Sequence, residues 1–114
     1  MEVKDLPTLY NRIQLQISKR KLVELLQEQL DRDFTRANME CFKLNTDVLD
    51  NAIFELSQRL NQLNQQDLTH LLYIADIPET QFTALNNTAE NSMDLAKTFL
   101  FRELLKVFYR LQFK

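Results

Sequence analysis

Three carboxylates lie in a row on one face of a predicted helix. Glu24, Glu28 and Asp31 follow one another at spacings of four and three residues. All-α metal-dependent nucleotide hydrolases hold Mg²⁺ on rows of this kind, because hard cations prefer carboxylate oxygens. A metal site in a bundle must point into the core, whereas this row lies opposite the leucines of its own helix. Arg20 and Arg32 each lie four residues from one of these acids and can pair with it. We therefore interpret the row as a solvated face that holds no metal.

The single histidine and the single cysteine offer little for catalysis. His70 follows Asp67 by three residues, which is the spacing of half a di-iron motif, but that chemistry needs two such motifs and further glutamates. One histidine and one cysteine are also too few ligands for a zinc site. Cys41 would need a base beside it to act as a nucleophile, and the only histidine falls on a different predicted helix. We predict no catalytic residue, no metal and no cofactor.

The most regular charged pattern is a row of cations. Arg102, Lys106, Arg110 and Lys114 recur every four residues along the last predicted helix. Such a row can meet phosphates or anionic lipid headgroups. Cations near a helix C-terminus also complement the helix dipole and solubilise an apolar helix, and we favour this second interpretation.

Two phenylalanines, Phe99 and Phe113, fall among these cations on the polar side of the same helix. Exposed large aromatic side chains often mark a surface that contacts another protein. We therefore predict a candidate interaction surface formed by Phe99, Arg102, Lys106, Arg110 and Phe113.

Composition excludes several classes of site. The chain has 114 residues, a net charge of −2 and no glycine. Phosphate-binding loops and dinucleotide-binding turns require glycine for positive φ and for close backbone approach, so both are excluded. The lack of glycine also disfavours sheets with many tight turns, whereas helices can end on asparagine. An acidic chain has no overall attraction for nucleic acid, and the length predicts a single domain over residues 1–114.

Two further features indicate a cytoplasmic protein. A single cysteine, Cys41, excludes an internal disulfide and suits a reducing compartment. The first residues contain no apolar segment typical of a signal peptide. The longest apolar run, Leu71 to Ala75, is too short to cross a bilayer, so we expect no membrane insertion.

Apolar residues at helical spacing predict an all-α fold, a bundle of four or five helices. The predicted helices cover roughly residues 18–34, 46–63, 67–75, 78–85 and 90–114. Ser18, Thr46 or Asn45, and Asp67 are the predicted N-caps. In the last helix the apolar residues span an arc of about 160°, wider than one neighbour needs. We expect this helix to be the centre of the bundle or to contribute to an interface.

The cleanest apolar stripe belongs to the helix predicted over residues 46–63. Its members lie within about 100° of one another on the helix and are Leu49, Ala52, Ile53, Leu56, Leu60 and Leu63. Gln58 lies on the opposite side. We expect Leu56, at the centre of the stripe, to be buried and Gln58 to be exposed.

The segment before Ser18 allows two interpretations. Asp5 can cap a helix with Pro7 in its first turn. Residues 12–18 also alternate between polar and apolar, which is typical of a strand, and residues 40–44 are the sole candidate partner. We favour the helix and keep a minor two-stranded β element over 12–18 and 40–44 as the alternative.

These patterns favour a non-enzymatic, small cytoplasmic helical protein that binds a protein partner or associates with itself. The alternative is a nucleic-acid-associated protein that uses the basic row of the last helix. A third and less favoured hypothesis is the all-α metal-dependent nucleotide hydrolase suggested by the acidic row.

Overall fold

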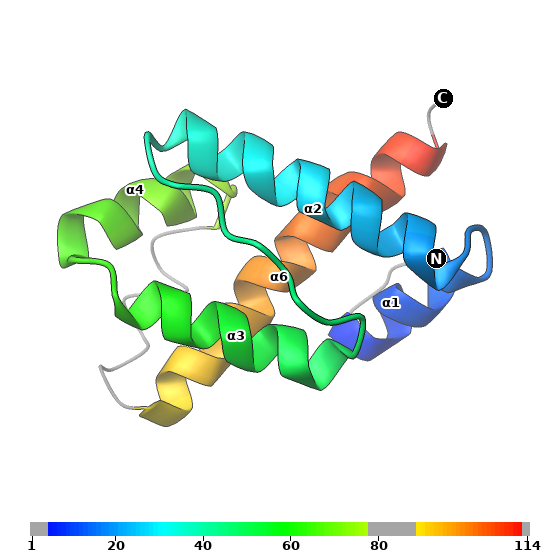
Figure 1. The fold of residues 1–114 in the computed structure, drawn as a ribbon, viewed down its shortest axis with the longest axis horizontal. Helices are drawn as coiled ribbons and strands as arrows, with labels where there is room; N and C mark the ends of the chain where they lie inside the picture. The colour runs from blue at the N-terminus through cyan, green and yellow to red at the C-terminus, as the bar shows by residue number, and fades with distance from the viewer. Residues whose placement is uncertain (1–4, 78–88, 113–114) are drawn as a thin grey trace.

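The computed structural model describes residues 5–77 and 89–112 of the chain. Its helices are α1 (Leu6–Gln14), α2 (Lys19–Arg36), α3 (Leu49–Asn61), α4 (Gln65–Ile74) and α6 (Ala89–Gln112), shown in Figure 1. The described part of the chain contains no strand, and the prediction of an all-α bundle of four or five helices is confirmed. The helix predicted over residues 78–85 lies outside the described residues. Within 5–77 and 89–112, no helix is both long enough and apolar enough to cross a membrane.

Helix α6 is the centre of the bundle. It contacts α1, α2 and α3, and in Figure 1 it crosses behind α2 and α3, with α1 and α4 near opposite ends of the molecule. Ala96, Phe99, Leu100 and Leu104 of α6 are fully buried. The wide apolar arc is explained by these several neighbours, as predicted for a central helix.

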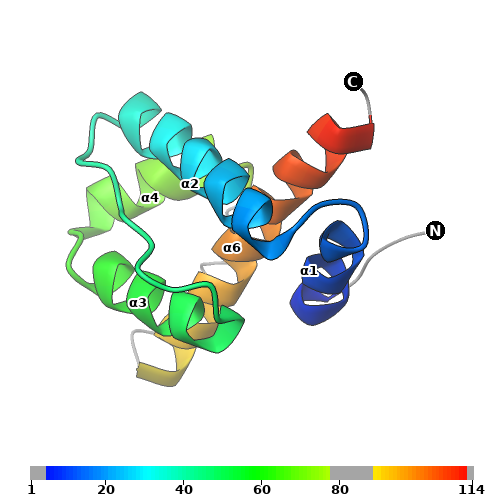
Figure 2. The same ribbon diagram turned by 45° about the vertical axis from the view of Figure 1, so that its right-hand side comes forward.

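Helices α2 and α3 run in the same direction, because the link between them, residues 37–48, returns along the length of the bundle (Figures 1 and 2). The Gln27 side chain of α2 holds this link. Its amide nitrogen donates to the Phe42 carbonyl at 2.7 Å, and its amide oxygen accepts from the Leu44 backbone nitrogen at 2.8 Å. The Arg59 guanidinium of α3 donates to the Glu40 carbonyl at 3.1 Å.

These side-chain bonds take the place of the minor β element proposed for residues 12–18 and 40–44. Residues 12–14 belong to α1, and residues 40–44 have no regular secondary structure. Backbone groups of a packed segment need hydrogen-bond partners, and Gln27 and Arg59 supply several of them without a second strand. The strand alternative is therefore wrong, and the helical interpretation of the segment after Asp5 is confirmed.

Two of the predicted N-caps are confirmed. The Asp5 carboxylate accepts from the Thr8 backbone nitrogen at 2.9 Å, and the Ser18 hydroxyl accepts from the Lys21 backbone nitrogen at 3.1 Å. Each bond satisfies a backbone nitrogen that has no partner within its helix. The bond from Thr8 also holds the pKa of Asp5 below its usual value.

The other two predicted N-caps are wrong. Val48 precedes α3, and the Thr46 hydroxyl accepts from the Val48 backbone nitrogen at 3.0 Å rather than from the first helical turn. Asn64 caps α4, because its side chain accepts from the Asp67 backbone nitrogen at 2.7 Å. Asp67 therefore lies within the first turn of α4, where its negative charge interacts favourably with the helix dipole.

Residues other than glycine supply the left-handed backbone at two helix ends. Asn38 follows α2 with φ of 60°, and Asp76 follows α4 with φ of 65°. Just after Asn38, the Met39 backbone nitrogen donates to the Phe34 carbonyl at 2.9 Å, which closes the end of α2. The prediction that helices of this chain can end on asparagine is confirmed by Asn38.

The apolar stripe predicted for α3 faces the core. Ala52, Ile53, Leu56 and Leu60 are buried, while Leu49 and Leu63 pack partly buried against them. Gln58 is exposed, as the stripe requires.

We expect Leu56→Ala to lower the free energy of unfolding by about 2–5 kcal/mol, because it removes buried methyl groups and leaves a cavity. Leu56 has no exposed surface. The control Gln58→Ala should change the free energy by no more than about 0.5 kcal/mol. Urea denaturation measures both, and equal losses would contradict this packing of α3.

Candidate functional site

The predicted basic row does not form a free line of cations along α6. The Lys106 side chain is only 19% exposed, and its ammonium lies 2.7 Å from Asp33 of α2. Arg110 is half-buried and donates to the Gln29 side chain of α2 at 3.1 Å. Arg102 is half-buried as well. Lys106 and Arg110 therefore tie α6 to α2, which is a different role from the solubilising one we predicted.

The predicted place of Phe99 on an exposed polar face is wrong. Phe99 is fully buried, and its ring packs edge-on against Phe34 of α2 with centroids 6.1 Å apart. Because α6 has neighbours on several sides, an aromatic residue outside its main apolar arc also meets another helix. Phe113 and Lys114 lie outside the described residues. Phe99, Arg102, Lys106 and Arg110 thus do not make one exposed surface.

A buried charged cluster joins α2 to α6. The Lys106 ammonium lies 2.7 Å from Oδ2 of Asp33 and 3.7 Å from Oε2 of Glu103, and it donates to the Ile74 carbonyl at 3.3 Å. The side chains of Asp33 and Glu103 are 1% and 0% exposed. Gln29, also buried, donates to Oδ1 of Asp33 at 3.3 Å. We call Asp33, Glu103 and Lys106 the buried cluster.

Glu103 is the neutral member of the buried cluster. Burial, reinforced by the neighbouring Asp33 carboxylate, raises the pKa of Glu103 to about 10. Neither carboxyl oxygen of Glu103 accepts a hydrogen bond. A protonated carboxyl is a donor, and Asp33 is close enough to accept. The cluster is thus one ion pair between Lys106 and Asp33 with a neutral acid beside it.

Sequence reasoning missed the buried cluster because it interpreted Lys106 as a solvated cation and assigned no role to Asp33 or Glu103. The spacing nevertheless carried a signal: Gln29 and Asp33 follow Leu22 and Leu26 at steps of four, three and four residues. That is the step pattern of a single helix face. Polar residues in such a register belong to a buried pair or to a site.

The acidic row is a surface feature, as interpreted from the sequence. Glu24 is exposed and lies 3.9 Å from Arg20 and 3.8 Å from Lys21. Glu28 is exposed, and Asp31 accepts from Gln27 at 2.9 Å. No three His, Cys, Asp or Glu side chains of the described residues are placed to share a metal ion.

His70 and Cys41 lie in different parts of the fold. His70 is exposed on α4, and Cys41 is exposed on the link between α2 and α3. The Cys41 sulfur lies 3.7 Å from the Thr35 hydroxyl, a contact that does not supply a base. This arrangement gives no support to nucleophilic catalysis.

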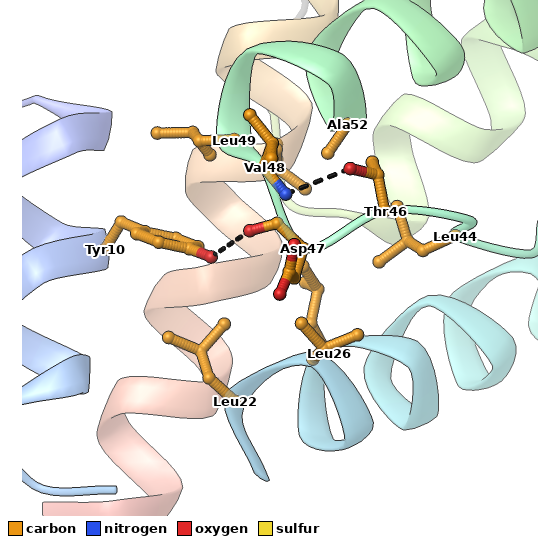
Figure 3. Close-up of a pocket in the computed structure, with 11 residues that line it drawn as sticks. Tyr10, Leu22, Leu26, Leu44, Thr46, Asp47, Val48, Leu49 and Ala52 are labelled. Atoms are coloured by element: carbon orange, nitrogen blue, oxygen red, sulfur yellow. Dashed lines mark hydrogen bonds between the residues drawn. The ribbon is translucent and has the colours of Figure 1, made fainter. Parts of the chain in front are cut away.

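A narrow space lies where Tyr10 of α1 meets the start of α3 (Figure 3). The Tyr10 hydroxyl donates to the Asp47 carbonyl at 2.7 Å, and burial, followed by the Asp47 carboxylate, raises the pKa of Tyr10. The volume of this space is about 10 Å³, and most of its lining is apolar, including Leu22 and Leu26. A water molecule needs about 10–15 Å³ and several polar partners, so the space is a packing gap and not a ligand site.

A larger recess lies between α2 and the end of α6, and we call it the α2–α6 pocket. Its apolar lining comes from Ile17, Leu25, Val107 and Leu111, and two cations, Lys21 and Arg110, complete it. Its volume is about 140 Å³. Cavities of roughly 150 Å³ with apolar walls accept benzene, so the α2–α6 pocket has room for one large apolar side chain.

A third hollow, of about 890 Å³, lies between the end of α2 and the outer face of α4. Its lining is mainly polar and includes Asn38, Asp67, His70 and Tyr73. Tyr73, the largest of the lining side chains, is 76% exposed, so this hollow does not shield it from water. It lacks the apolar enclosure that a ligand site requires.

Neither a protein-family model, nor a curated protein, nor a solved structure matches this chain.

Proposed function

We propose that this protein is a non-enzymatic interaction module that docks on protein through the α2–α6 pocket. The observation that carries the proposal is the pocket itself, in which four apolar side chains leave about 140 Å³ unfilled beside two cations. Protein interfaces concentrate their binding energy where one aromatic or aliphatic side chain fills such a recess. Cys41, an exposed free thiol, supports a reducing compartment such as the cytoplasm.

The buried cluster is a less suitable centre for catalysis. Strongly shifted pKa values do mark many active sites, and the pKa of Glu103 is shifted strongly. A reacting group must also reach a substrate, whereas Glu103 has no exposed surface. The three pockets described above are lined by other residues. The geometry of the cluster therefore supports a structural role.

The nucleic-acid hypothesis has less geometric support than docking on protein. Tracking a phosphate backbone requires several cations that are free to face it. Lys106, in the middle of the basic row, is only 19% exposed and is held by the buried Asp33, so it cannot face a phosphate backbone. The chain as a whole carries a net charge of −2, so its long-range field repels polyanions.

Site-specific photo-crosslinking in cells that produce the protein tests the proposal. A benzophenone amino acid in place of Leu111 should form adducts with protein, because Leu111 lines the pocket. The same group in place of Gln66, exposed on α4, is the control and should form few. The adduct must also disappear when Leu25→Asp introduces a charge into the pocket lining. Adducts with nucleic acid alone, or none from position 111, would count against docking on protein.

A further inference from the structure

The chain itself presents a side chain that suits the α2–α6 pocket. The large apolar side chains exposed within residues 5–77 and 89–112 are Leu15, Val48, Phe54, Tyr73 and Tyr109. Phe54, on the outer face of α3, is 52% exposed. Asp50 lies four residues before Phe54, so the two side chains are neighbours on one helix face, and Asp50 is exposed as well.

We infer that a second copy of this chain occupies the α2–α6 pocket, with Phe54 of one copy inserted between α2 and α6 of the other. This inference rests on the proposed function and names the partner that the pocket binds. Asp50 of the inserting copy then lies at the rim, beside Lys21 and Arg110 of the receiving copy.

The size of the pocket fits this occupant. A volume of about 140 Å³ is close to the roughly 150 Å³ that holds benzene, and the Phe54 side chain ends in the same ring. Ile17, Leu25, Val107 and Leu111 supply apolar walls. Moving the ring from water into these walls is favourable by the hydrophobic effect.

The charges of the two surfaces are complementary. Lys21 is exposed at the start of α2, and Arg110 is fixed by its bond to Gln29, which in turn donates to Asp33. A guanidinium held in place loses little freedom when it binds a carboxylate. Side chains four residues apart on a helix have Cβ atoms about 6 Å apart. Insertion of Phe54 therefore brings Asp50 within reach of these two cations.

Two different surfaces meet in this contact, since the pocket lies between α2 and α6 while Phe54 lies on α3. Association is therefore head-to-tail, or reciprocal if both pockets of a pair are filled. A contact centred on one aromatic ring is at the weak end of protein interfaces. We expect reversible association that increases with protein concentration.

Sedimentation velocity of the purified chain, up to high micromolar concentration, tests the inference. Wild type should associate, and Phe54→Ser should remain monomeric. Lys21→Glu should weaken association roughly tenfold by placing like charges together, whereas the matched control Lys19→Glu, also exposed on α2 but outside the pocket lining, should change it less than about twofold. Combining Lys21→Glu with Asp50→Lys should restore tighter association than either single variant. All four positions are exposed, and circular dichroism verifies that each variant folds.

Three results would overturn the inference. These are a wild-type chain that stays monomeric at every concentration, association that persists in Phe54→Ser, and equal weakening by Lys19→Glu and Lys21→Glu. Monomeric wild type together with crosslinks from position 111 to another protein would remove the second copy as partner and leave the proposed function in place. Loss of those crosslinks would remove the proposed function itself.

Discussion

Lys106→Met is expected to lower the free energy of unfolding by about 3–5 kcal/mol, the usual loss when one member of a buried ion pair is removed. Methionine keeps the apolar stem of the side chain but removes the ammonium. Asp33, with 1% of its side chain exposed, then keeps a buried negative charge without its cation. The Ile74 carbonyl, which accepts from Lys106 at 3.3 Å, loses a donor as well. Urea denaturation near neutral pH measures the loss.

The matched control for Lys106→Met is Lys97→Met. Lys97 is exposed on the same helix, so its replacement should change the free energy of unfolding by about 0.5 kcal/mol at most. The double variant Asp33→Leu/Lys106→Met removes both charges and should recover most of the loss, because an apolar pair often replaces a buried ion pair at little cost. A loss under about 1 kcal/mol in Lys106→Met would show that the ion pair contributes little to stability.

The helices and their apolar faces were predictable because each depends on neighbours in the sequence. The spacing of Leu22, Leu26 and Leu30 identifies the inner face of α2, and all three are buried. Ser18 caps that helix by a local bond to Lys21. Patterns of this kind repeat every three to four residues and need no knowledge of the tertiary structure.

The polar residues of the core were not predictable in the same way. Glu103 and Asp33 are buried because α2 and α6 cross where their side chains meet Lys106. Each residue alone is typical of a solvated surface, and only the pairing of two helices separated by many residues makes burial possible. The prediction that Phe99 is exposed was wrong for the same reason, because its contact with Phe34 depends on how α2 lies against α6.

The α2–α6 pocket shows the limit of examining one helix at a time. Leu25 and Leu111 line the same pocket, although no pattern along the chain relates α2 to the end of α6. The exposed Phe54, by contrast, was accessible to sequence reasoning, because it lies on the side of α3 opposite Leu56. Phe54 is thus an exposed aromatic residue on a polar helix face, the position that we predicted for Phe99.

The buried carboxyl of Glu103 makes the stability of the fold depend on pH. Its pKa rises from 4.5 in the unfolded chain to about 10 in the folded protein, owing to burial first and then to Asp33. Below pH 4.5 the carboxyl is protonated in both states, and its contribution to stability is fully present. As the pH rises from 4.5 towards 10, the unfolded chain releases this proton while the folded protein keeps it. Stability therefore falls, by at most about 1.4 kcal/mol per pH unit for one proton.

Glu103→Gln is expected to raise the free energy of unfolding by roughly 2–3 kcal/mol at pH 7. The amide has nearly the shape of the protonated carboxyl and is neutral at every pH. Wild type must take up a proton when it folds at pH 7, which lowers its stability, whereas the variant folds without this step. The two proteins should be similarly stable near pH 4, and their difference should widen steadily up to about pH 9. Urea denaturation at several pH values measures both curves, with Glu28→Gln, an exposed carboxylate on α2, as the control that should follow wild type. Parallel curves for wild type and Glu103→Gln would show that Glu103 is ionised in the folded protein. The cluster would then hold two carboxylates on one lysine, and the effect of Lys106→Met would have to be larger still, because two buried charges would lose their cation.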